Sequence, residues 1–470
     1  MRPEPQAADY RPDTPIQAIA DWLADPVEAA DFPQAIPRFR NSRHDKTVGL
    51  DGLDEAAWLA HFARFEPLEG NLPRPLALRY HGHQFRVYNP DIGDGRGFLF
   101  AQLRDAGGRL LDLGTKGSGT TPYSRTADGR LTLRGAIREI LATEMLEALG
   151  ANTSKTFAVI ETGEVLERHD EPPPVRSAVM TRLSHGHIRI GSFQRLADLG
   201  ERENLAALVN YCLEHYPGPE APADAPEGDV PAVKLLHQVV ERLADLAASY
   251  MAAGFVHGVL NTDNMNITGE SFDYGPWRFL PQWDPGFTAA YFDHSGLYAF
   301  GRQPEAIHWN CAQLAIALRP LVEAPPLVAA IERFPALYGA ALARRWCWRL
   351  GVESRGAAQD AALVSACERA IKAGALAPHE LFHRHRFGAH AEGELAEALE
   401  GRESVGPQSE YWQAAEPEGL EIGEVNDVLD ACCLRDDWDV LDRKVSAIRA
   451  LGNALGPAPE PSGHANRLRK

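Results

Sequence analysis

Runs of apolar residues in the first half of the chain predict two neighbouring strands and a helix. Segments 98–103 and 109–116 are rich in leucine and phenylalanine, and the turn sequence Asp-Ala-Gly-Gly lies between them at 105–108. Apolar residues then recur at helical spacing over 131–149, and Gly150 follows as a stop signal. We therefore expect a strand hairpin followed by a helix.

Two further strands and a longer helix are predicted downstream. Segments 157–160 and 177–183 have strand composition, and the sequence Glu-Thr-Gly-Glu at 161–164 predicts a turn between them. A low-complexity, proline-rich loop covers 217–231. Apolar residues at spacings of three and four then predict a helix over 232–253.

The rest of the chain is predicted to be mainly helical. Alanine and leucine dominate beyond about residue 305, and the tail from Gly456 has the prolines, glycines and basic residues typical of disorder. A strand-rich segment with one embedded helix thus precedes a helix-rich segment. This order indicates an α+β protein and suits a two-lobed, protein-kinase-like fold, although other α+β folds share it.

Composition excludes several classes of function. The 470 residues carry a formal net charge of −18, which disfavours broad binding to nucleic acid or to anionic membranes. The six cysteines have neither zinc-site spacing nor the density of a disulfide scaffold. The N-terminus lacks the apolar core of a secretory signal, and no apolar run reaches the length of a membrane span. We expect a cytoplasmic protein with several structural units.

Two glycine-rich segments and a lysine are candidates for binding phosphate. Gly93-Asp-Gly-Arg-Gly97 could bring backbone N–H groups close to a phosphate, although this segment taken alone is better explained as a turn before the next strand. Lys116 ends a predicted strand and begins a second glycine-rich turn that runs to Arg130. Glu139 follows on the predicted helix, and protein kinases pair a strand lysine with a helix glutamate in this order.

The most specific pattern follows the long predicted helix. His257 begins the sequence His-Gly-Val-Leu-Asn-Thr-Asp-Asn, and Asp273 lies in a Phe-Asp-Tyr-Gly turn shortly afterwards. Small-molecule kinases place a metal-binding asparagine seven positions after such a histidine, and a metal-binding aspartate in the later turn. Asn264 and Asp273 occupy these positions, and both offer oxygen ligands that suit Mg²⁺.

Val259 stands where such kinases have the aspartate that accepts the proton of the substrate hydroxyl. Valine cannot accept a proton, so the chain is either inactive or uses another base. Asp263, next to Asn264, is the candidate, and the alternative is that both residues only cap a turn.

Two arginines complete the candidate phosphate site. Arg182 and Arg189 follow Thr181, near which the preceding predicted strand ends, and a guanidinium can hold two phosphate oxygens at once. His185 and His187 lie between them without an acid or cysteine at ligand spacing, so we interpret both as structural.

Literal sequence strings from residue 75 to 315 resemble the selenoprotein-O family of pseudokinase-fold enzymes. They include YHGHQF at 80–85, the glycine-rich segments at 93–96 and 116–130, Ile-Arg-Glu at 137–139, and the motifs beginning at Ser184 and His257. The resemblance implies a kinase-like fold that binds ATP in a flipped orientation. It also implies transfer of AMP to Ser, Thr or Tyr hydroxyls of proteins with Mg²⁺, or Mn²⁺ in its place.

The resemblance also implies residue roles. Lys116 and Glu139 would form an ion pair, Asn264 and Asp273 would bind the metal, and Asp263 would accept the proton. The residues that would hold the nucleotide are Gly93, Gly95, Arg96, Lys116, Asp128, Gly129, Arg182, Arg189 and Asp273. We accordingly divide the chain into an N-terminal extension (1–75), a strand-rich nucleotide-binding lobe (76–195), a helical lobe with catalytic and metal-binding loops (196–330) and a C-terminal helical region (331–470).

The chain also departs from the family pattern. Arg86 replaces the usual glycine after Gln-Phe, Thr115 replaces a common leucine before the lysine, and the C-terminal redox motif is absent, since the last cysteine is Cys433. Two other functions stay open. One is a conventional phosphotransferase, which Val259 disfavours; the other is a nucleotide-binding scaffold without catalysis.

Overall fold

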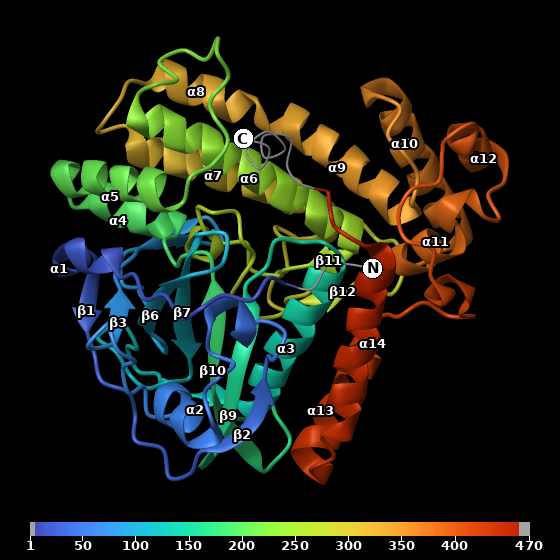
Figure 1. The fold of residues 1–470 in the computed structure, drawn as a ribbon. Helices are drawn as coiled ribbons and strands as arrows, with labels where there is room; N and C mark the ends of the chain where they lie inside the picture. Colours follow the sequence, from blue (N-terminus) through green and yellow to red (C-terminus); the bar gives the residue numbers. More distant parts are fainter. Residues whose placement is uncertain (1–4, 460–470) are drawn as a thin grey trace.

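The computed structural model describes residues 5–459 and contains one large antiparallel sheet (Figure 1). Neighbouring strands, in the order β1-β3-β6-β7-β10-β9-β2, pair along the sheet, and β8 pairs with β10. Their bounds are β1 Ala24–Pro26, β2 Ile36–Arg40, β3 Leu76–Leu78, β6 Leu99–Arg104, β7 Leu110–Lys116, β8 Leu131–Thr132, β9 Lys155–Leu166 and β10 Val175–Ser184. The strand hairpin predicted from the sequence is confirmed as β6 and β7.

The first 40 residues supply both edges of this sheet. β1 pairs with β3 at one edge, and β2 pairs with β9 at the other. A paired edge leaves fewer free backbone N–H and C=O groups than an open one. The N-terminal segment is therefore part of the sheet that carries Lys116.

The turn expected at 161–164 is wrong, because β9 continues through these residues to Leu166. The carboxylate of Glu161 accepts hydrogen bonds from Arg38 on β2 and Arg176 on β10, at 2.7 and 2.6 Å. These cross-strand ion pairs hold the backbone extended where its local composition favours a turn.

Helix α3 (Leu133–Ala148) packs against β9 and β10 and confirms the helix predicted over 131–149. The side chain of Thr132 caps its first turn by accepting a hydrogen bond from the N–H of Gly135 at 3.0 Å. Most of its residues are buried, because the sheet covers one face and C-terminal helices cover the other.

A set of helices lies beside the sheet, and α6 is at its centre (Figure 1). Helix α6 confirms the helix predicted over 232–253, and Gly254 ends it with a φ of +67°. The bounds are α4 Ile190–Asp198, α5 Arg202–His215, α6 Pro231–Ala253, α7 Gln303–Leu318, α8 Ala324–Glu332 and α9 Phe334–Leu350. The chain is thus an α+β protein, as expected.

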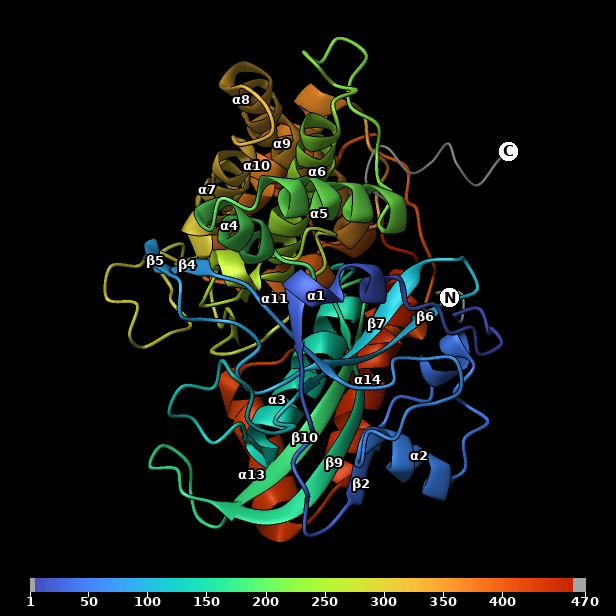
Figure 2. The same ribbon diagram turned by 90° about the vertical axis from the view of Figure 1, so that its left-hand side faces the viewer.

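The helices after α9 take two different paths. Helices α10 (Ala357–Gly374), α11 (Pro378–Arg384) and α12 (Gly393–Leu399) extend it, whereas α13 (Ile422–Arg435) and α14 (Asp439–Leu455) return along α3 (Figures 1 and 2). Most of the tail predicted to be disordered, residues 460–470, lies outside the described residues.

Candidate active site

The structure brings Lys116, Glu139 and Asp273 together at the junction of the sheet and the helices. Lys116 is the last residue of β7, and Glu139 lies in the second turn of α3. The Lys116 ammonium donates to the Glu139 carboxylate and lies 3.0 Å from Oδ1 of Asp273. The predicted ion pair therefore forms, and it also reaches the predicted metal ligand.

Asp273 lies among cations. Nη1 of Arg182 is 3.6 Å from its Oδ1. Burial would raise the pKa of Asp273, but Lys116 and the arginines Arg182, Arg189 and Arg96 hold this pKa well below its ordinary value. The carboxylate is therefore negative at neutral pH. Its backbone φ of +64° is a conformation that aspartate adopts more readily than most residues.

Aromatic rings and acids hold the two predicted arginines. Both guanidinium groups lie over the ring of Phe272, at 4.9 Å for Arg182 and 5.0 Å for Arg189. Nη2 of Arg189 is also 3.3 Å from Oδ1 of Asp94, in the first glycine-rich segment. Sequence reasoning missed Asp94 and Phe272 as supports, although both lie inside motifs that it identified.

His187 has the structural role that the sequence indicated. Nε of Arg182 donates to Nε2 of His187 at 3.2 Å, and Nδ1 of His187 donates to Oδ2 of Asp112 at 3.1 Å. Burial lowers the pKa of His187, which keeps the ring neutral and able to accept from Arg182. The chain Asp112–His187–Arg182 fixes the direction of this guanidinium.

The two glycine-rich segments pack against each other. A Cβ atom at Gly93 would lie 2.4 Å from the ring of Tyr123, so glycine is required there by close approach. The Thr121 hydroxyl donates to the carbonyl of Asp94 at 2.5 Å, and the N–H of Gly117 donates to the carbonyl of Arg96 at 2.7 Å. A Cβ at Gly95 would lie 3.0 Å from the carbonyl oxygen of Tyr123.

Asp128 and Gly129 lie at the far end of the second segment. Asp128 forms an ion pair with Arg168 at 2.8 Å. Gly129 has a φ of +70°, and a Cβ there would lie 2.2 Å from the carbonyl oxygen of Gly119. These contacts tie the end of the second glycine-rich segment to Gly119 near its beginning and to Arg168.

The pKa of Asp263 is shifted in the opposite direction to that of Asp273. It lies in a short 3₁₀ helix (Thr262–Asn264), is 8% exposed, and its Oδ1 has no hydrogen-bond partner among the described residues. Burial raises the pKa of Asp263 to about 6. A Cβ at Gly82 would lie 2.8 Å from its Oδ1, so a glycine is what leaves room beside the carboxylate.

His257 joins the loops that carry Asp263 and Asp273, and Asn264 braces the Asp263 loop from within. Burial lowers the pKa of His257 to about 4, and its neutral ring donates from Nε2 to the carbonyl of Phe272 at 3.2 Å. The side-chain nitrogen of Asn264 donates to the carbonyl of Val259 at 2.9 Å. This bond uses the amide nitrogen of Asn264, so its oxygen is the end that could bind a cation.

A hairpin covers the Asp263 loop. Strands β4 (Gly82–Gln84) and β5 (Val87–Asn89) form it. The N–H of His83 donates to the hydroxyl of Thr262 at 2.7 Å, and the N–H of Phe85 donates to Oδ1 of Asn261 at 3.1 Å. The string at 80–85 marked the resemblance, and the structure adds that it holds the loop in place.

Within residues 5–459, no three or more His, Cys, Asp or Glu side chains gather into a set that could hold a metal ion by themselves. The oxygens of Asp273 and Asn264 fit a cation that takes its other ligands from phosphate and water, as Mg²⁺ does. Over the same residues, none of the helices has the length and apolar character needed to span a membrane.

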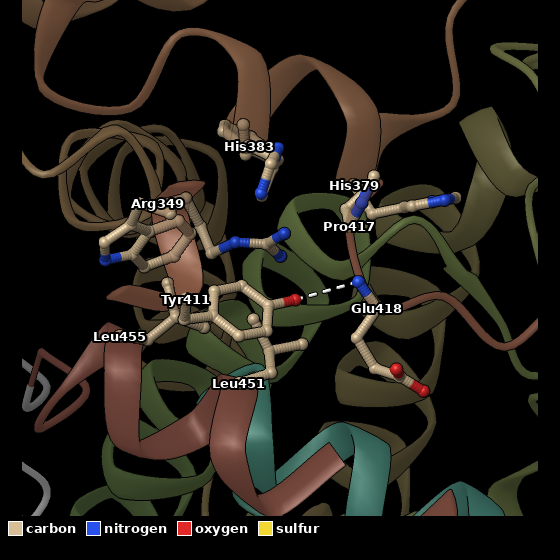
Figure 3. A pocket seen from close by; sticks show the side chains of 10 residues that line it. Arg349, His379, His383, Tyr411, Pro417, Glu418, Leu451 and Leu455 are labelled. Atoms are coloured by element: carbon tan, nitrogen blue, oxygen red, sulfur yellow. Dashed lines mark hydrogen bonds between the residues drawn. The ribbon is translucent and has the colours of Figure 1, made fainter. Parts of the chain in front are cut away.

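A pocket among the C-terminal helices contains none of the predicted residues (Figure 3). Its volume of about 10 Å³ is room for about one water molecule. The Arg349 guanidinium that points into it also donates to the carbonyl of Ala252 at 2.9 Å, and the N–H of Glu418 donates to the Tyr411 hydroxyl at 2.8 Å. In the adjoining cleft, Arg386 donates to two carbonyls at the end of α9. Both arginines thus donate hydrogen bonds to backbone carbonyls in the last turns of helices α6 and α9.

Comparison with known proteins shows which family the chain is similar to. A family model described as protein adenylyltransferase SelO matches residues 7–414. The chain is 48% identical over 339 residues to a protein nucleotidyltransferase YdiU of Synechococcus elongatus, covering 72% of this chain and 67% of the relative. It is 44% identical over 376 residues to the protein of the same name from Gloeobacter violaceus, covering 80% and 76%.

Proposed function

The chain belongs to the family described as protein adenylyltransferase SelO, and from this membership we propose that it transfers AMP from ATP to serine, threonine and tyrosine hydroxyls of proteins. It is a nucleotidyltransferase, the activity that also names its relatives. The acceptors are proteins rather than nucleic acids, and the reaction takes place in the cytoplasm.

We propose that the fold is a two-lobed, kinase-like one. The sheet with α3 forms one lobe, and the helices around α6 form the other. The observation that supports this assignment is the pairing of Lys116 at a strand end with Glu139 on the helix that packs against the sheet. The Asp273 loop comes from the helical side and meets this pair.

The cations around Asp273 would receive the triphosphate. Lys116, Arg182, Arg189 and Arg96 already act on one carboxylate, and phosphate oxygens are of the same charge. The glycine-rich segments with Gly93, Gly95 and Gly129, together with Asp128, would enclose the nucleotide. Asn264 and Asp273 would hold Mg²⁺, or Mn²⁺ in its place, which neutralises charge on the phosphates.

Asp263 carries the proposed chemistry. Its unpartnered Oδ1 is the group that could accept the proton of the acceptor hydroxyl, because Val259 cannot. As the hydroxyl oxygen forms its bond to the α-phosphorus, the bond from that phosphorus to the β-phosphate oxygen breaks, and pyrophosphate leaves. Positioning and charge neutralisation by the chain's own cations supply most of the remaining rate.

The test is to incubate the protein with Mg²⁺ and a mixture of candidate acceptor proteins, using ATP labelled at the α-phosphate or at the γ-phosphate. We expect protein-bound label from the α position only. Protein-bound label from the γ position alone would establish a conventional phosphotransferase. Binding of ATP without label transfer from either position would establish a scaffold.

A further inference from the structure

The helix hairpin made of α13 and α14 lies along the outer face of α3, the helix that carries Glu139 (Figures 1 and 2). Two ion pairs join them. Arg134 on α3 pairs with Asp430 on α13. Arg449 on α14 donates to both carboxylate oxygens of Glu144 on α3, at 2.6 and 2.8 Å.

These ion pairs lie symmetrically about Glu139. Arg134 is five positions before Glu139, and Glu144 is five positions after it. Five residues advance a helix by about 7.5 Å and turn it by about 140° beyond a full turn, in opposite senses on the two sides. Both pairs therefore lie on the face of α3 away from Glu139, one on each side of it along the axis. A helix held at these two points can neither tilt nor slide freely.

The hairpin is itself fixed to the sheet. Oδ1 of Asp436, between α13 and α14, lies 3.0 Å from Arg176 on β10 and 3.2 Å from Arg38 on β2. Arg176 also donates to the carbonyl of Cys432 at 3.2 Å. The hairpin thus contacts the sheet and α3 together, and it can fix one relative to the other.

The contact with α3 is close and buried. A Cβ atom at Gly452 would lie 3.1 Å from the Cα atom of Ala148, so the backbones of α14 and α3 almost touch. Glu144 is only 4% exposed. A buried carboxylate needs its cation, so Arg449 cannot leave without strain on α3.

We propose that the α13–α14 hairpin positions Glu139, and that Arg134 and Glu144 are the positioning residues through which it acts. This inference rests on the proposed function, because it assumes that the Lys116–Glu139 pair holds the triphosphate. The hairpin follows residue 414, where the match to the family model ends. When the ion pairs between the hairpin and α3 are lost, α3 moves and Glu139 turns away from Lys116. Lys116 then keeps only its ion pair with Asp273.

The test compares the double variant Asp430→Asn/Arg449→Gln with wild type in the full chain. We expect the Kd for Mg-ATP and the KM for ATP in AMP transfer to rise about tenfold, with a smaller change in kcat, because the lysine acts on bound phosphates before and during transfer. Asp430→Asn alone, which changes a partly exposed side chain, is expected to give about a two- to threefold rise and serves if the double variant does not fold.

Rescue separates positioning from mere stability. The charge swap Arg134→Glu/Asp430→Arg restores the first ion pair and should return the Kd for Mg-ATP to near wild type, whereas Arg134→Glu alone should not. Glu394→Gln is the matched control, because it removes an ion pair between α12 and α10, away from α3. Unchanged Kd and KM in the double variant would overturn the proposal.

Failure of the proposed function would be visible separately. Wild type would then bind Mg-ATP without transferring AMP, and the Kd comparison would still decide whether the hairpin positions Glu139.

Discussion

Asp263 and Asp273 lie ten positions apart in the chain, but their surroundings shift their pKa values in opposite directions. Cations surround Asp273 and hold its pKa well below the ordinary value. Asp263 has an oxygen without a partner, and burial raises its pKa to about 6. Two identical side chains are thereby prepared for different work: a permanent anion suits a metal ligand, and a weaker acid suits proton transfer.

The comparison also shows how the site tolerates a buried carboxylate with an unpartnered oxygen. The residues around Asp263 are held by other contacts, since the hairpin of β4 and β5 bonds to Asn261 and Thr262 on the same loop. These contacts hold the loop through groups other than Oδ1 of Asp263, so this oxygen is available for chemistry. Removing each carboxylate in turn would test this difference.

The largest effect is expected for Asp263→Asn. AMP transfer should fall about 10²–10⁴-fold, the contribution of a general base, because asparagine cannot take the proton. The Kd for Mg-ATP should stay close to wild type, and the melting temperature of the nucleotide-free protein should not fall, because the variant removes a charge that burial disfavours. Labelled-ATP transfer, calorimetry and thermal unfolding measure these three quantities. A large fall in melting temperature would contradict the comparison.

Asp273→Asn should reverse this pattern in the nucleotide-free protein. Lys116 and Arg182 lose the anion between them, so we expect the free energy of unfolding to fall by about 3 kcal/mol. Mg-ATP binding should weaken as well, because a metal ligand is lost. Denaturant unfolding with and without Mg-ATP measures both effects. If Asp273→Asn were as stable as wild type while Asp263→Asn were not, the assigned roles would have to be exchanged.

A pH-dependent change in the free energy of unfolding, smaller at low pH, is expected for Glu270→Gln. Burial raises the pKa of Glu270 to about 7, although it accepts a hydrogen bond from the N–H of His185 at 2.8 Å. The folded state therefore binds the proton more tightly than the unfolded state, and wild type loses stability as pH rises from about 4.5 to 7. The variant keeps the hydrogen bond without the charge. The gain in unfolding free energy of the variant over wild type should therefore be about 1 kcal/mol at pH 5 and about 3 kcal/mol at pH 8.

The control for this measurement is Glu203→Gln, which changes an exposed glutamate on α5. Its unfolding free energy should follow that of wild type at both pH values. A Glu270→Gln advantage of equal size at pH 5 and pH 8 would show that shape rather than charge causes it. AMP transfer should survive in Glu270→Gln, which would show that a raised pKa alone does not make a carboxylate catalytic.

Local pattern predicted several elements well. Helices α3 and α6 could be predicted because each is one continuous segment, and the spacing of its apolar residues can be seen within that segment alone. The turn predicted at 161–164 failed for the complementary reason. Its residues favour a turn locally, but Arg38 and Arg176 reach Glu161 from neighbouring strands and hold it extended.

The sequence by itself determined which chemical groups the site has and in what order: the glycine-rich segments, Lys116, Glu139, Asp263, Asn264 and Asp273, with a valine where a kinase base would stand. It also led to the family through literal strings. Only the tertiary structure decided that four cations act on Asp273 while Oδ1 of Asp263 has no hydrogen-bond partner among the described residues, and that α13 and α14 hold α3 on both sides of Glu139. The reason is physical: residue types are written along the chain, whereas burial and the distance between charges depend on segments far apart in it.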